Sequence, residues 1–110
     1  IINRLDNYIS SIWTWIQSQS IYQNKTTLII TTDHGRGEYL NDKWGDHGQG
    51  VPGAEFVWAA IIGPDTPSMG ELSNIDTVST NQISSTISHL LSYEFKSDRN
   101  VGSIIKRMIK

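Results

Sequence analysis

The sequence has no cysteine, which excludes disulfide bridges, thiolate metal ligands and cysteine nucleophiles. Proline is scarce, and no apolar stretch approaches the roughly 20 residues needed to cross a bilayer. The formal net charge of −2 over 110 residues argues against a nucleic-acid-binding surface. The length suits one domain or part of a larger one.

Apolar residues at helical spacing predict two helices. The first covers residues 3–18, and the second covers residues 79–91, with Thr80 or Asn81 as its cap. The apolar faces consist of Leu5, Ile9, Ile12, Trp13 and Ile16 in the first helix and Ile83, Ile87, Leu90 and Leu91 in the second.

Two apolar runs, residues 26–32 and 56–62, predict strands that flank a long polar segment. Continuous apolar runs are typical of strands buried on both faces, as in a parallel sheet. The order helix, strand, loop, strand, helix is an α/β order. We therefore predict an α/β fold in which the helices cover a mostly parallel sheet.

The glycine-rich segment 35–53 is too long for a simple connection, and loops of this length are usually functional or disordered. It is entered through Asp33-His34-Gly35, and a second imidazole follows in Asp46-His47-Gly48. Hard divalent ions favour carboxylate oxygen, and zinc also binds neutral imidazole. Because ligand sites gather at the carboxyl ends of strands in open α/β sheets, Asp33, His34 and His47 are candidate metal ligands. One alternative is an Asx turn with an exposed His34, and another is a single-zinc site.

The segments LIITTDHGRGEY and WGDHGQGVPGAEFVWAAIIGP resemble the C-terminal part of the alkaline phosphatase superfamily. That superfamily includes sulfatases, nucleotide phosphodiesterases, phosphopentomutase and cofactor-independent phosphoglycerate mutase. The resemblance implies an alkaline-phosphatase-like core, of which residues 1–110 would be the C-terminal segment. It also implies two divalent ions, zinc or manganese, which act as Lewis acids. Asp33 and His34 would bind the ion that activates the nucleophile and His47 the other, whereas sulfatases use a single ion, usually calcium.

The superfamily carries its nucleophile, a Ser, Thr or modified Cys, and further ligands in its N-terminal half. We assign no nucleophile within this chain and predict that the chain alone is inactive. We also expect the natural N-terminus, with any targeting signal, to lie upstream of Ile1. No compartment is assigned, and a periplasmic or secreted location is compatible. Arg36 and Lys43 are candidates to contact an anionic substrate, with solvated loop charges as the alternative.

The sequence thus predicts the C-terminal part of a metal-dependent phosphoryl or sulfuryl ester hydrolase, of phosphatase, phosphodiesterase or sulfatase type. One alternative is a metal-dependent phosphomutase of the same superfamily. The other is a non-catalytic, truncated remnant. The expected partner is a phosphate or sulfate ester, not nucleic acid, and exposed apolar area would favour self-association.

Overall fold

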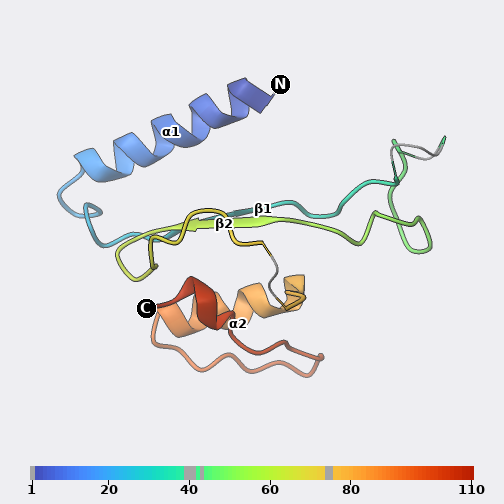
Figure 1. Ribbon diagram of the computed structural model, residues 1–110. Coiled ribbons are helices and arrows are strands. Elements are labelled where there is room, and N and C mark those ends of the chain that lie inside the picture. Colours follow the sequence, from blue (N-terminus) through green and yellow to red (C-terminus); the bar gives the residue numbers. More distant parts are fainter. Residues whose placement is uncertain (1, 39–41, 43, 74–75) are drawn as a thin grey trace. The chain divides into compact units, whose positions relative to one another are not determined.

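The computed structural model describes residues 2–38, 42, 44–73 and 76–110. The elements, in order, are α1 (Ile2–Ser18), β1 (Leu28–Thr31), β2 (Ala59–Ile62), η1 (Thr80–Gln82), α2 (Ile83–Leu90) and η2 (Lys106–Met108) (Figure 1). Ile29–Ala60 forms one unit, and Ile1–Leu28 together with Ile61–Lys110 forms the other. No helix in these described ranges is long and apolar enough to cross a membrane.

The first predicted helix is confirmed as α1. Some polar side chains of this helix donate hydrogen bonds to its own backbone. The Ser11 hydroxyl, for example, donates to the Asn7 carbonyl at 2.7 Å. No described residue of α1 is buried, and Leu5 and Ile12 on its apolar face are each more than half exposed. The helix is amphipathic, and the residues of its apolar face are exposed or only partly buried.

The two predicted strands are neighbours, but they run antiparallel in a two-stranded sheet. The Thr31 hydroxyl donates to the Trp58 carbonyl at 2.8 Å, and Thr27 lies against Gly63, so residue numbers rise along one strand and fall along the other. The predicted mostly parallel sheet covered by helices is therefore wrong. Parallel neighbours need a crossover connection, usually a helix. None of the described residues between the two strands is helical.

The apolar runs contain more hydrophobic surface than a two-stranded sheet can bury. All four residues of β1 are partly or fully exposed, and three of the four residues of β2 are exposed. Just before β2, Phe56 is 74% exposed and Trp58 55% exposed. A continuous apolar run indicates that a strand can be buried on both faces. It does not determine whether the neighbouring strand is parallel or antiparallel.

The second predicted helix is confirmed as η1 followed by α2. It is preceded by Ser79 rather than by the predicted caps, Thr80 or Asn81. The Gln82 side-chain oxygen accepts the backbone N–H of Ser79 at 2.9 Å. This is one half of a capping box, in which the residue at the third helical position satisfies a free donor at the helix start.

The C-terminal segment lies along α2 and is held there by the hydroxyl groups of Ser85 and Thr86 (Figure 1). Thr86 is 1% exposed, and its hydroxyl donates to the Gln82 carbonyl at 2.8 Å. The same oxygen accepts the backbone N–H of Ile105 at 3.0 Å. The Ser85 hydroxyl donates to the Gly102 carbonyl at 2.7 Å. A threonine in the middle of a helix thus serves as the attachment point for the chain end.

We predict that Thr86→Val lowers the free energy of unfolding by about 1–3 kcal/mol, because the buried N–H of Ile105 loses its acceptor. Thr86→Ser keeps the hydroxyl and should retain most of this stability. Thr14→Val, at an exposed position of α1, is the matched control and should change little. Urea denaturation followed by circular dichroism measures all three, and equal midpoints for Thr86→Val and Thr14→Val would contradict the assignment.

Candidate functional site

Backbone hydrogen bonds hold the loop that carries the candidate ligands. The N–H groups of Gly35, Gly37 and Glu38 donate to the carbonyls of Ala54 (2.8 Å), Asp46 (3.0 Å) and Pro52 (3.1 Å), respectively. The donors follow β1 and the acceptors precede β2, so chain pairing continues beyond the strands themselves. The loop is consequently anchored on both sides of the two histidines.

Asp33 and His34 follow β1 after one intervening residue, Thr32, and their side chains lie close to each other. The backbone N–H of His34 donates to Asp33 Oδ1 at 2.9 Å. The imidazole Nε2 lies 3.6 Å from Asp33 Oδ2, too far for a hydrogen bond. Two ligands about 2.1 Å from one tetrahedral zinc ion would lie about 3.4 Å apart. The spacing between the Asp33 oxygen and the His34 nitrogen therefore suits a shared ion.

His47 returns to this place and stacks on His34. The ring centroids are 4.0 Å apart and the planes differ by 20°. An imidazole lone pair lies in the plane of its ring, so two nearly parallel rings do not aim at the same point. The two imidazole planes therefore lie side by side.

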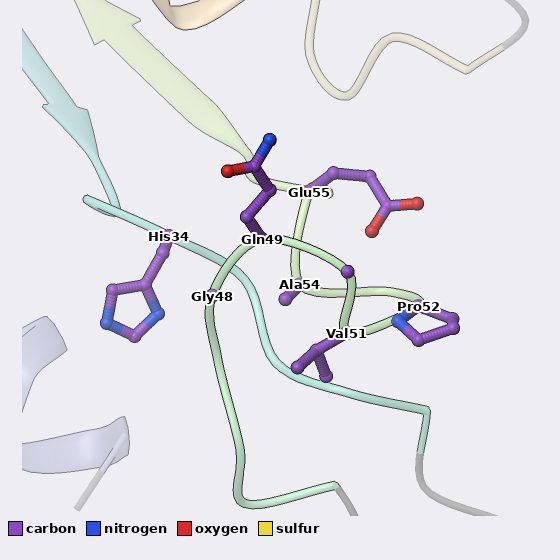
Figure 2. A pocket seen from close by; sticks show the side chains of 8 residues that line it. His34, Gly48, Gln49, Val51, Pro52, Ala54 and Glu55 are labelled. Atoms are coloured by element: carbon purple, nitrogen blue, oxygen red, sulfur yellow. The ribbon is translucent and has the colours of Figure 1, made fainter.

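Among the described residues, no three His, Asp or Glu side chains converge to hold one ion. Glu55, the next acidic residue along the returning chain, points its carboxylate away from the His34 ring (Figure 2). Asp33 and His34 thus lie together, and the His47 ring is stacked on that of His34.

A hollow of about 680 Å³ opens beside His34 (Figure 2). Its volume falls within the range of small-molecule sites. The lining is mostly apolar or backbone and consists of His34, Gly48, Gln49, Gly50, Val51, Pro52, Ala54 and Glu55. Sequence reasoning did not identify Gln49 or Ala54 as lining residues. Three glycines of this stretch, Gly48, Gly50 and Gly53, have positive φ, and glycine is the residue type that signals such backbone curvature in a sequence.

Arg36, a candidate for contacting an anionic substrate, is exposed and does not line the hollow. Its guanidinium carbon lies 5.8 Å from the centre of the Trp44 ring, within the range of a cation–π contact. One guanidinium nitrogen of Arg36 also donates a long hydrogen bond of 3.5 Å to the Gly45 carbonyl. Lys43, the other candidate, lies outside the described residues.

The chain matches no protein-family model, no curated protein and no solved structure. The resemblance to the alkaline phosphatase superfamily therefore rests on the motifs around Asp33 and His47 alone. The function has to be argued from the geometry of those residues.

We predict that Gly53→Ala lowers the free energy of unfolding by about 1–3 kcal/mol, the cost of a strained backbone at a non-glycine residue. Gly53 has a φ of +91°, and a Cβ there would lie 2.9 Å from the Arg36 carbonyl oxygen. Gly45→Ala is the control, because nothing lies within 4 Å of its Cβ position. Chemical denaturation should separate the two variants. Equal stability would show that the loop does not depend on this backbone turn.

Proposed function

We propose that this chain is part of a metal-dependent hydrolase of phosphoryl or sulfuryl esters. The observation that carries the proposal is the separation of 3.6 Å between Asp33 Oδ2 and His34 Nε2. It is supported by the His47 ring, whose centroid lies 4.0 Å from that of His34. One carboxylate and two imidazoles form a donor set typical of zinc, and zinc ligand distances fit the first pair.

Asp33 and His34 would hold one divalent ion and His47 a second. Bound ions of this kind supply Lewis acidity and hold the attacking and leaving oxygens of an ester in line. This chain would hold the three ligands at fixed positions relative to one another. The backbone hydrogen bonds that flank the histidines would fix these positions. The nucleophile and the remaining ligands are expected from the upstream half that the resemblance implies.

The surroundings of the three ligands suit an ester with an anionic head and a less polar remainder. The hollow beside His34 has a lining of small and apolar groups, including Val51, Pro52 and Ala54. Arg36 supplies an exposed guanidinium in the same loop, whose edge is able to pair with phosphate or sulfate oxygens. We propose that the reacting group sits at the histidines and that the remainder of the ester occupies the hollow.

The test is replacement of Asp33 or His47 by Ala in the full-length protein that contains this chain. Each variant should bind less zinc or manganese. Each should also lose several kcal/mol of transition-state stabilisation in ester hydrolysis, the scale expected for a metal Lewis acid. Metal content is measured by mass spectrometry, and turnover with a chromogenic phosphate monoester, a phosphodiester and a sulfate ester. His89→Ala, at an exposed position of α2, is the matched histidine control.

Each outcome of this test separates the candidate functions. Unchanged metal content and rate in His47→Ala would contradict the metal assignment. Transfer of a phosphoryl group within a substrate, without release of phosphate, would show a mutase. No turnover of any ester by a protein that retains its metal would contradict a hydrolase and favour a remnant.

A further inference from the structure

We propose that the two ring nitrogens of His34 have separate tasks and that Gly35 is the positioning residue that separates them. In this assignment Nδ1 is held as a donor to the Gly35 carbonyl, and Nε2 is the atom that faces the metal ion. The inference rests on the proposed function, because it specifies how the first ligand pair is prepared for its ion. It has observable consequences even in the absence of metal.

The task of Nδ1 follows from its partner. His34 Nδ1 lies 2.7 Å from the backbone oxygen of Gly35, and the His34 side chain is 38% exposed. A carbonyl oxygen can only accept a hydrogen bond, so Nδ1 must carry the hydrogen. In a neutral imidazole the other nitrogen then keeps its lone pair. The geometry thus selects the tautomer in which Nε2 is free to bind a metal ion.

The task of Nε2 follows from the position of Asp33. Oδ1 of this carboxylate accepts the backbone N–H of His34 at 2.9 Å, which ties the carboxylate to the neighbouring residue. Oδ2 is left 3.6 Å from Nε2. A direct hydrogen bond between Nε2 and Oδ2 would close this gap to about 3 Å. The open spacing is the one that two ligands of a single zinc ion require, about 3.4 Å.

Only glycine permits the carbonyl of residue 35 to occupy this place. A Cβ built on Gly35 would lie 2.9 Å from the Gly53 carbonyl oxygen, and it would collide with the carbonyl oxygen of Phe56. At the same time the Gly35 N–H donates to the Ala54 carbonyl at 2.8 Å. Residue 35 therefore crosses the returning chain in direct backbone contact, and this contact fixes where its own carbonyl points.

A hydrogen bond from the second ring nitrogen to a carbonyl is how a metal-binding histidine is usually oriented. Loss of such a partner typically lowers metal affinity by 10- to 100-fold. We expect Gly35→Ala to weaken zinc binding by a factor of about 10–100 for this reason. Gly45→Ala, in the same loop, has no atom within 4 Å of its Cβ position and should bind zinc as the unmodified protein does.

The decisive measurement is nitrogen NMR of the full-length protein labelled with ¹⁵N-histidine, first without metal, at about pH 8, where imidazoles of ordinary basicity are neutral. We expect the His34 signals to show hydrogen on Nδ1 and none on Nε2. Addition of zinc should then shift the Nε2 signal much more than the Nδ1 signal. Hydrogen on Nε2 in the metal-free protein would overturn the assignment, whatever the behaviour of the variants.

A pair of substitutions at residue 34 tests the same point by stability. The side-chain amide nitrogen of Asn lies as many bonds from Cα as Nδ1 of histidine, so His34→Asn keeps a donor for the Gly35 carbonyl. His34→Ala removes it. We expect His34→Asn to retain most of the unfolding free energy that His34→Ala loses, while both variants lose zinc binding. Equal stability losses in the two variants would show that the bond from Nδ1 does not hold the ring.

The measurements separate failure of this inference from failure of the proposed function. Hydrogen on Nδ1 with no response of any His34 signal to zinc or manganese would overturn the metal site. Zinc binding by a ring that carries its metal-free hydrogen on Nε2 would overturn the assignment of the nitrogens and leave the metal site intact. If Gly35→Ala fails to fold, the tautomer measurement and the residue 34 pair still decide the question.

Discussion

Antiparallel backbone pairing between the chain that leaves β1 and the chain that returns to β2 is the constraint on which the candidate site depends. His34 directly precedes Gly35, whose N–H is bonded to the returning chain, and His47 directly follows Asp46, whose carbonyl accepts from Gly37. Each histidine is thus one residue from a fixed point. A free loop of this length would lose considerable conformational entropy in bringing two side chains together. Here the backbone hydrogen bonds offset that loss before any ion is bound.

The sequence located the helices and strands better than it arranged them. Apolar spacing places α1 and α2 because the helical period is a local property of the side chains that form each face. Residues 26–32 and 56–62 were recognisable as strands for the same local reason. The direction of pairing is not local, because it depends on whether the chain between the strands crosses over or turns back. The continuous apolar runs around Ile29 and Ile61 favoured a parallel sheet, but such runs reflect how deeply a strand can be buried and do not fix the direction in which the chain returns.

The same distinction applies to the candidate site: its residues could be identified from local sequence, but their arrangement depends on contacts between distant parts of the chain. Asp33, His34 and His47 were identifiable because few residue types bind metal and these three lie in one polar, glycine-rich stretch. The stacking of the two imidazole rings, whose planes differ by 20°, could not be predicted, because it depends on where the backbone returns and not on residue type. The role of Gly35 was equally hidden, since every residue carries a carbonyl and only the folded chain shows which carbonyl meets a ring nitrogen. Likewise, only the structure shows that Trp44 stacks against Arg36.

The low stability of the strand pair bears directly on the candidate site, because the site is formed only when the two strands are paired. A two-stranded sheet is marginally stable in water, and the residues of β2 are largely exposed. An ion bound by Asp33, His34 and the ligands supplied elsewhere would favour the paired state, because a ligand stabilises the conformation that binds it. The coupling is reciprocal, so any contact that strengthens the pairing at Gly35 also raises the affinity for the ion. If the proposed metal site is present, backbone pairing and metal affinity would be two measures of one equilibrium. Gly35, the glycine that permits the closest backbone approach, would then contribute to both.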